Sequence, residues 1–193
     1  MLSLKNSLAV LRKTDALLEG HFVLSSGLHS PQYVQCAKLL SKPTQAKKFI
    51  SSLATKIKRN IKSFDVILSP AMGGVIIGYE IGRLLRKETI FCERVDKKFK
   101  LRRGFYIKKK AKILIVEDVI TTGKSSLECV RLIKKFGGKF VGIACLIDRS
   151  KKLKMSKKII SQVKLDIPVY KRNKLPTSLK NIQISKPGSR FLR

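Results

Sequence analysis

The sequence predicts one domain of the α/β class, with a mostly parallel central sheet flanked by helices. Apolar runs rich in β-branched residues recur along the chain, and such runs are typical of strands buried on both faces. Segments with the periodicity of amphipathic helices lie between them. We expect residues 1–193 to form a single domain, because the length suits one core and the hydrophobic fraction of 44% argues against disorder.

The first predicted elements are a helix and a hairpin. Apolar residues at helical spacing predict a helix over residues 2–19, with an irregularity at Thr14 and Asp15. Residues 20–35 then predict a β-hairpin with its turn at Ser26 and Gly27. A surface loop is the alternative for this polar turn, and composition alone favours the loop.

A long helix and a buried strand follow. Thr44 is a suitable N-cap for a helix to about residue 61, with lysines opposite its apolar face. Residues 65–70 predict a buried strand, and residues 71–74, Ala-Met-Gly-Gly, lead into a helix over about 75–86. The glycines let the backbone approach an anion closely at that helix N-terminus. A tight strand-to-helix turn explains the glycines equally well.

Residues 113–125 carry the strongest functional pattern. An apolar strand leads to Glu117 and Asp118, and the hydroxyl-rich turn over 121–125 opens another helix. Ligands of open α/β sheets bind at the carboxyl ends of strands, and phosphates bind at helix N-termini. The stretch therefore predicts a site for a phosphorylated sugar, although an ordinary βα unit is the alternative. A nucleotide-hydrolysing P-loop is disfavoured, because Asp118 stands where its first glycine belongs.

The remaining segments alternate between strands and charged loops. Residues 88–94 predict a strand that leads into a basic loop over 95–104, for which a solvated charged hairpin is the alternative. Residues 140–147 predict a buried strand that ends in Asp148-Arg149, where a surface ion pair is the simplest interpretation. Residues 163–167 are a candidate edge strand, and we expect little regular structure over 171–193.

Composition excludes several classes of protein. The formal charge of +31 would suit nucleic-acid binding, but the lysines are spread over the whole length and aromatic residues make up only 7%. We therefore favour a general drift towards lysine, with no nucleic-acid partner and a positive field that steers polyanionic substrates. The four cysteines are too scattered for a zinc site or a disulfide framework. No apolar run approaches the ~18 residues of a membrane span, so we expect a cytoplasmic protein without a membrane partner.

Several motifs resemble those of one enzyme family. Residues 113–125 resemble the 5-phosphoribosyl 1-pyrophosphate (PRPP) motif of type I phosphoribosyltransferases. Residues 20–33, Gly-His-Phe-Val-Leu-Ser-Ser-Gly-Leu-His-Ser-Pro-Gln-Tyr, are similar to the N-terminal signature of orotate phosphoribosyltransferases. Residues 91–105 resemble the segment around the mobile catalytic loop of that family, and the 186–190 ending resembles one bacterial branch. The likeness runs from residue 20 to residue 190 in the order of the family.

The resemblance implies a fold, a reaction and an assembly. The fold is that of type I phosphoribosyltransferases, with a small N-terminal hood subdomain over about residues 1–40. The reaction transfers the phosphoribosyl group of PRPP to N1 of orotate, which gives orotidine 5′-monophosphate and pyrophosphate in pyrimidine biosynthesis. The cofactor is Mg²⁺, held mainly by PRPP, near Asp118, without direct protein ligands. The assembly is a homodimer in which the mobile loop closes over the site of the partner subunit.

The resemblance also implies roles for individual residues. Catalytic roles fall to Glu117, Asp118, Arg94, Lys98 and Lys100. The PRPP site consists of Met72, Gly73, Gly74, Glu117, Asp118, Val119, Ile120, Thr121, Thr122, Gly123, Lys124 and Ser125. The orotate pocket consists of Ser25, Ser26, Thr121 and Arg149. The mobile loop offers further basic residues, and the sequence does not decide among them.

Two departures and two rival functions accompany this interpretation. Ser25 stands where one family branch has lysine, and the mobile loop lacks a histidine that some members carry. A type I enzyme acting on a purine would keep the central motif, but should lack the signature over 21–33 and the pairing of Arg149. A nucleic-acid-binding regulator on the same scaffold is supported only by the charge.

Overall fold

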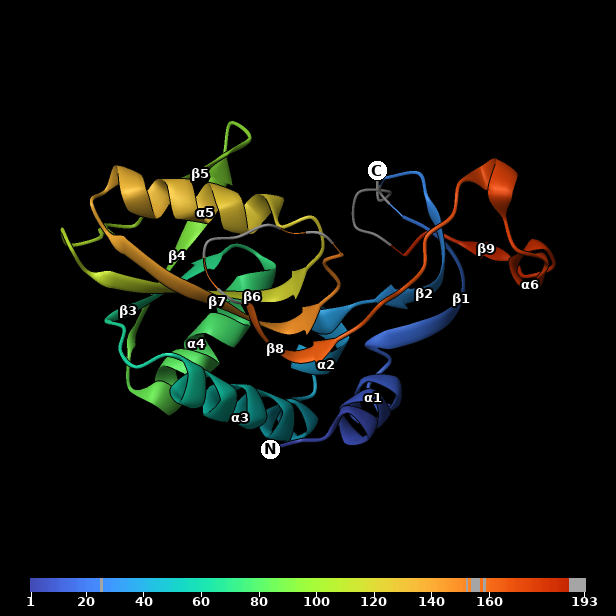
Figure 1. Cartoon of the computed structure of the whole chain (residues 1–193), viewed down its shortest axis with the longest axis horizontal. Helices are drawn as coiled ribbons and strands as arrows, with labels where there is room; N and C mark the ends of the chain where they lie inside the picture. Colours follow the sequence, from blue (N-terminus) through green and yellow to red (C-terminus); the bar gives the residue numbers. More distant parts are fainter. Residues whose placement is uncertain (25, 152, 154–156, 158, 188–193) are drawn as a thin grey trace.

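The chain forms two sheets in the computed structural model, which describes residues 1–24, 26–151, 153, 157 and 159–187 (Figure 1). The larger sheet has six strands in the order β5-β4-β3-β6-β7-β8, and the smaller has three in the order β2-β1-β9. In Figure 1 the larger sheet lies on the left and the smaller on the right. The described helices include none long and apolar enough to cross a membrane.

The larger sheet is parallel except at one edge. Its strands are β3 (Val66–Pro70), β4 (Glu88–Val95), β5 (Lys98–Leu101), β6 (Lys112–Ile120), β7 (Lys139–Asp148) and β8 (Ile159–Lys164). β3 pairs in parallel with β4 and β6, and β7 pairs in parallel with β6 and β8. The pairing of β5 with β4 is antiparallel. The predicted α/β fold with a mostly parallel sheet is confirmed.

Helices cover both faces of this sheet. They are α3 (Pro43–Asn60) and α4 (Gly73–Leu85) on one face and α5 (Lys124–Lys135) on the other (Figure 1). Side chains alternate along β6, so that Leu114 and Val116 join the apolar core of α3 and α4. Ile113 and Ile115 join the core that contains Ile133 of α5. The same alternation decides which face of the sheet each polar side chain at the end of β6 occupies.

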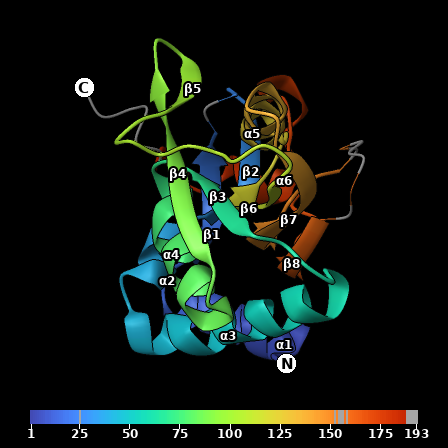
Figure 2. The ribbon, with the colours of Figure 1, turned by 90° about the vertical axis from the view of Figure 1, so that its left-hand side faces the viewer.

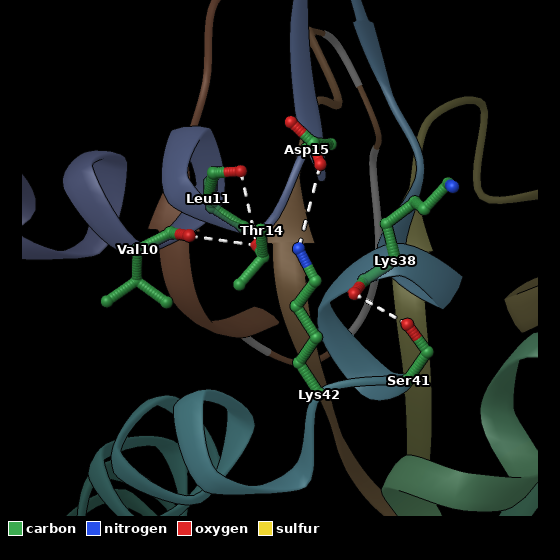
Figure 3. Close-up of polar contacts among 7 residues, drawn as sticks. All are labelled: Val10, Leu11, Thr14, Asp15, Lys38, Ser41 and Lys42. Carbon is green, nitrogen blue, oxygen red and sulfur yellow. Dashed lines mark hydrogen bonds and ion pairs between the residues drawn. The ribbon is translucent and has the colours of Figure 1, made fainter.

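The N-terminal helix is shorter than the sequence predicts, because local contacts end it (Figure 3). The Thr14 hydroxyl donates to the carbonyls of Val10 at 2.8 Å and Leu11 at 3.2 Å, which ends α1 (Leu4–Lys13). Asp15 has a φ of 56° and turns the chain away, with its carboxylate 3.6 Å from Lys42 Nζ. The chain is then free to enter β1.

The smaller sheet joins distant parts of the chain. Its strands are β1 (Leu17–Val23), β2 (His29–Val34) and β9 (Ile184–Ser185), and α2 (Cys36–Leu40) leads from it to α3. The sequence predicts little regular structure after residue 171, and this is wrong for part of that segment. There the chain forms η1 (Arg172–Lys174), α6 (Thr177–Lys180) and β9, which pairs in parallel with β1. We call the small sheet and residues 168–187 the hood.

The basic segment after β4 is a hairpin, which the sequence offers as the alternative to a basic loop. β4 continues to Val95 and pairs with β5 across Asp96 and Lys97. Both turn residues have positive φ values, 50° and 63°, as two-residue hairpin turns that match strand twist require. The hairpin projects from the body of the molecule in Figures 1 and 2. Its charged side chains lie mostly in solvent, in agreement with the solvated charged hairpin that the sequence offers as the alternative.

Candidate functional site at the carboxyl edge of the sheet

Polar groups from three neighbouring strands gather at the carboxyl edge of the large sheet. β3 leads into the turn before Gly73, β6 carries Glu117 and Asp118, and β7 leads to Arg149. The strands are parallel and adjacent in the order β3-β6-β7, so their carboxyl ends share one edge. The register places Ile120 of β6 opposite Asp148 of β7. This is the edge at which α/β sheets bind ligands.

The two carboxylates lie on opposite faces of β6. The sequence places them at the carboxyl end of the strand, and β6 continues through both to Ile120. Because successive side chains of a strand alternate, Glu117 follows Ile113 and Ile115 towards α5. Asp118 follows Leu114 and Val116 towards α4. Each acid therefore meets a different helix N-terminus.

Asp118 lies directly against Gly73, the first residue of α4. A Cβ atom placed on Gly73 would stand 2.5 Å from Asp118 Oδ2 and 2.8 Å from Oδ1, so only glycine fits here without a shift. The backbone N–H of Val119 donates to Asp118 Oδ1 at 2.8 Å. Burial raises the pKa of the Asp118 carboxyl, although this hydrogen bond opposes the shift. The turn over 71–74 and the acidic motif thus form one surface.

Glu117 is buried and tied to α5. Its side chain is 6% exposed, and the Ser126 hydroxyl donates to its Oε1. Burial raises the pKa of Glu117 to about 7, the Ser126 hydrogen bond opposes the shift, and the charge of Asp118 adds to it. A carboxyl group with this pKa is poised to change charge near neutral pH. The sequence prediction did not include Ser126, which comes directly after the predicted motif. Its position on the buried face of an amphipathic helix is the feature of the sequence that could have indicated it.

The turn over 121–125 caps α5 and faces outward. Gly123 has a φ of 71° and forms the N-cap of the helix, whose first N–H groups have no partner within the helix. The Lys124 N–H lies 3.4 Å from the Thr122 hydroxyl. Thr121, Thr122 and Lys124 are exposed, while Gly123 is buried. Exposed hydroxyls and N–H groups at a twelve-residue helix start suit an anion.

Arg149 is a half-buried cation at the end of β7. Its backbone N–H donates to the carbonyl of Ile120 at 2.8 Å, which fixes it beside the end of β6. The ion pair with Asp148 that the sequence suggests is not found among the described residues. Asp148 instead accepts from the N–H and hydroxyl of Ser150 at 2.8 and 2.6 Å.

The guanidinium of Arg149 has unused hydrogen-bonding capacity. Burial lowers its pKa, and Tyr33 of the hood acts in the opposite direction. Its Nε is buried and has no hydrogen-bond partner among the described residues. A buried donor without a partner is costly, so this atom calls for an acceptor from a ligand. A planar guanidinium is suited to a carboxylate.

The hood contributes one exposed turn. It is closed by hydrogen bonds from the Leu24 N–H to the Leu28 carbonyl at 2.8 Å and from the Gly27 N–H to the Leu24 carbonyl at 2.9 Å. Ser26 is exposed at this turn, and the φ of Gly27 is 77°. Ser25, the other predicted contact of the base, lies outside the described residues.

The basic hairpin is held by contacts of its own. Arg94 Nη1 lies 3.0 Å from Glu128 Oε2 of α5 and donates to the Lys97 carbonyl at 2.6 Å. The Arg94 guanidinium also lies 4.2 Å from the centre of the Phe99 ring. Lys100 Nζ is 3.0 Å from Asp96 Oδ2, and Lys98 is exposed. No described contact brings these three predicted residues to the carboxylates of β6, and Figure 2 shows the tip of the β4–β5 hairpin projecting beyond the rest of the sheet.

Comparison with known proteins connects this site to a family. A model described as the phosphoribosyl transferase domain matches residues 36–179. The orotate phosphoribosyltransferase of Erythrobacter litoralis is 45% identical over 185 residues, which are 95% of this chain and 96% of that protein. The one of Parvibaculum lavamentivorans is 46% identical over 182 residues, 93% of this chain and 94% of that protein. The chain belongs to the orotate phosphoribosyltransferase family.

Solved structures share the fold of this family member. The crystal structure of orotate phosphoribosyltransferase from Aeropyrum pernix aligns with a TM-score of 0.73 at 23% identity, over 81% of this chain and 92% of that one. An adenine phosphoribosyltransferase from Thermoanaerobacter pseudethanolicus aligns with a TM-score of 0.61 at 20% identity, over 69% of this chain and 88% of that one. At these identities the likeness shows the fold alone. Since enzymes named for different bases share it, the fold does not select the base.

Candidate metal ligands in this phosphoribosyltransferase are few. Among the described residues, no three His, Cys, Asp or Glu side chains gather as a metal site. The carboxylate oxygens of Asp118, beside the exposed Gly73, are donors of the kind that Mg²⁺ prefers. The residues present therefore fit a Mg²⁺ ion that takes most of its ligands from a bound substrate.

Proposed function

We propose that the chain transfers the 5-phosphoribosyl group of PRPP to N1 of orotate, forming orotidine 5′-monophosphate and pyrophosphate. One observation supports this choice of base most directly. Half-buried Arg149, whose Nε has no hydrogen-bond partner in the described part of the chain, stands at the same sheet edge as the phosphoribosyl motif. Orotate carries a carboxylate, and a guanidinium such as that of Arg149 binds carboxylates well. Both substrates would then meet between the hood and the sheet edge of one domain.

The donor is assigned to the sheet edge. Thr121, Thr122, Gly123, Lys124 and Ser125 would hold the 5′-phosphate at the start of α5, where helix N–H groups favour an anion. The turn at Met72, Gly73 and Gly74 would hold pyrophosphate at the start of α4 by the same physics. Val119 and Ile120 lie between these two anion sites along β6 and would contact the donor through their backbone.

The acids are assigned to the sugar. Glu117 and Asp118 would bind the ribose hydroxyls and stabilise positive charge on the ring as pyrophosphate leaves. Orotate N1 forms its bond to the anomeric carbon and gives up its proton to water or to pyrophosphate, while the bond from that carbon to the pyrophosphate oxygen breaks. Positioning and electrostatics suffice for this substitution, so no side-chain nucleophile is required.

The base is assigned to the space between Arg149 and the hood. Arg149 would bind the orotate carboxylate in a bidentate manner, and Thr121 lies next to Ile120, whose carbonyl accepts from the Arg149 N–H. Ser26 at the tip of the hood turn, together with Ser25, would contact the polar edge of the ring. The pocket thus combines both sheets of the molecule.

Mg²⁺ is the proposed cofactor. When bound, it neutralises the pyrophosphate and helps this group to leave. Asp118 is the protein group best placed to orient it, because its carboxylate lies against the proposed pyrophosphate turn. Asp118 is expected to act on the ion through the substrate or through water, and not as one of several protein ligands.

The proposed role of the β4–β5 hairpin depends on the proposed homodimer. Met72, Ile76 and Tyr79 are 85%, 59% and 66% exposed and recur at helical spacing, which supports a homodimer formed through this side of α4. Arg94, Lys98 and Lys100 would then serve the site of the partner subunit, where they would contact pyrophosphate. Arg94 would have to leave Glu128 to do so. No nucleic acid or membrane is needed as a partner.

The proposed compartment is the cytoplasm. All four cysteines are free and buried, with no disulfide among the described residues. Free thiols are the usual state in the reducing cytosol. Charged substrates such as PRPP and orotate would also be available there.

Product formation tests the proposed function. Purified protein with PRPP, orotate and Mg²⁺ should form equal amounts of orotidine 5′-monophosphate and pyrophosphate, resolved by chromatography. A chelator of divalent cations should stop the reaction, and fresh Mg²⁺ should restore it. Pyrophosphate release without the nucleotide product would contradict the proposal, because it would indicate hydrolysis of the donor.

A further inference from the structure

The chain has two histidines, and they contact each other inside the hood. His21 of β1 and His29 of β2 are 2% and 5% exposed. His21 Nε2 lies 2.6 Å from His29 Nδ1, and the ring centres are 4.9 Å apart. At this distance one nitrogen must carry the proton and the other must accept it. The two rings are therefore joined by one buried hydrogen bond, donated by one ring nitrogen and accepted by the other.

The pair stands at the base of the exposed hood turn. Val23 pairs with His29 where the two strands run into the turn, and the Leu24 N–H donates to the Leu28 carbonyl one residue further on. His29 also exchanges two backbone hydrogen bonds with Tyr170, at 2.9 and 2.8 Å. His21 pairs with Ile184 of β9. The two histidines thus also connect, through their backbones, both strands of the turn and the C-terminal segment.

The surroundings disfavour added charge on the pair. Burial, then His21, then the positive charge of Arg172 in η1 all lower the pKa of His29. His21 Nδ1 is buried without a hydrogen-bond partner among the described residues, so a proton placed there would have no acceptor. The titratable or charged side chains on the elements packed against the pair are Glu19 of β1, Tyr33 of β2, Tyr170 and Lys171 before η1, Arg172 and Lys174 of η1, and Lys186 after β9. Glu19 is exposed and already paired with Arg12, so it does not neutralise the pair.

We propose that His21 and His29 are a positioning pair for the orotate-binding turn, and that a proton added to the pair weakens orotate binding. The inference rests on the proposed function, which places orotate at Ser26. In the neutral pair, the shared hydrogen bond holds β1 and β2 in the register that presents the turn. A second proton between the rings would set two N–H groups against each other across 2.6 Å and separate the strands. A proton on an outer nitrogen would leave an unpaired charge in the hood.

The effect of the added proton on orotate binding can be measured, because linked binding equilibria are reciprocal. If orotate prefers the neutral pair, orotate must make the pair harder to protonate by the same factor. A threefold preference lowers the midpoint of protonation by about 0.5 pH unit. PRPP and pyrophosphate occupy the sheet edge in the proposed function, so they should leave the midpoint in place.

Nuclear magnetic resonance of the intact chain tests the proposal, since two histidines give two resolvable imidazole C2–H signals. We expect the His29 signal to show a neutral ring at pH 7, because burial, His21 and Arg172 lower its pKa from 6.5, and saturating orotate should lower its midpoint by about a further 0.5 unit while pyrophosphate does not. A His29 midpoint that does not move with orotate would overturn the proposal. Orotate turnover is measured first on the same sample, so a loss of the proposed function is recognised separately from a failure of the coupling.

Variants give a second, independent readout. His21→Leu should raise the KM for orotate about fivefold at pH 7.5 and leave the KM for PRPP within about twofold. His21→Gln can donate an amide N–H to His29 Nδ1 but cannot gain a proton, so it should restore the orotate KM and flatten its rise below pH 6.5. Glu19→Gln, an exposed change on the same strand, should behave like the wild type. Equal changes in both KM values for His21→Leu would reduce the pair to a general structural role and overturn the proposal.

Discussion

The carboxyl edge of the large sheet and the hood are built by different parts of the sequence. At the edge, the residues assigned to the sugar and its 5′-phosphate lie in one run over 117–125, and each is placed by the strand and helix that it belongs to. In the hood, the contacts join distant residues, such as His29 with Tyr170. The residues over 117–125 form a continuous motif, which the 71–74 turn after β3 and Arg149 after β7 join at the edge. The hood depends on strand pairing across almost the whole chain.

This difference separates the two substrates. The run over 117–125 and the 71–74 turn are the parts of the edge that we assign to the phosphoribosyl donor, and structures named for adenine and for orotate share the fold of the chain. Arg149 and the hood turn are the groups that we assign to the base. Changes at the edge should therefore impair use of the donor or the chemical step. Changes at Arg149 or in the hood should act first on orotate.

Asp118→Asn should have the largest effect. We expect kcat to fall about 100- to 1000-fold, the range for loss of one electrostatic contact to the transition state. The melting temperature should hold or rise, because burial already disfavours the charged form of Asp118. Steady-state kinetics and thermal unfolding measure the two effects. Activity near that of the wild type would refute the assignment of this carboxylate.

Arg149→Ala should affect orotate specifically. Loss of hydrogen bonds to a charged carboxylate costs about 2 kcal/mol, so the KM for orotate should rise about 30-fold. The KM for PRPP should stay within about threefold. Arg131→Ala, which removes an exposed arginine of α5, is the matched control and should change neither value. Equal increases in both KM values would count against a role in the orotate pocket.

Gly73→Ala should lower kcat/KM for PRPP about tenfold without loss of stability. The added methyl group would press on the Asp118 carboxylate, 2.5 Å away, in an exposed part of the turn. Gly82→Ala, on the same helix, is the opposite case, because its Cβ would meet the Lys87 carbonyl at 2.9 Å. Overpacking of that kind costs about 1–3 kcal/mol. It should lower the melting temperature while the folded enzyme stays active.

The pH dependence at Glu117 should give the smallest effect. Its pKa of about 7 lies above the ordinary value of 4.5, so its contribution to stability is complete below pH 4.5 and is lost as pH rises through 7. Glu117→Gln should therefore gain melting temperature over the wild type as pH rises from 5 to 8. Ser126→Ala removes a hydrogen bond that lowers this pKa, so the loss of stability should move to higher pH. If both variants show the same dependence of melting temperature on pH as the wild type, the raised pKa of Glu117 is wrong.

Sequence reasoning succeeded where structure is local and fell short where it depends on tertiary contacts. Periodicity predicts the strand that became β6 and the helix that became α5, because burial of one face leaves a pattern in adjacent residues. It does not show that β6 continues past Asp118 and so sends Glu117 and Asp118 to opposite faces. Nor does it show β9, since a two-residue strand exists only by pairing with β1. The partners Ser126 and Glu128 were missed because their contacts cross between elements.

The β4–β5 hairpin also depends on tertiary contacts that the sequence pattern does not show. A run of lysines and arginines without apolar periodicity reads as a loop, although Phe99 is buried and Arg94 packs on its ring. The turn at Asp96 and Lys97 lacks the glycine or asparagine that usually marks positive φ values. Residue type alone could therefore not locate this turn.

A panel of bases tests most directly whether the edge supplies the donor while Arg149 and the hood select orotate. Pyrophosphate release from PRPP and Mg²⁺ is measured with orotate, uracil, adenine, guanine and hypoxanthine at equal concentrations. We predict release with orotate and less than about 1% of that rate with uracil, which lacks the carboxylate that Arg149 would bind. Turnover of a purine with none of orotate would contradict the account.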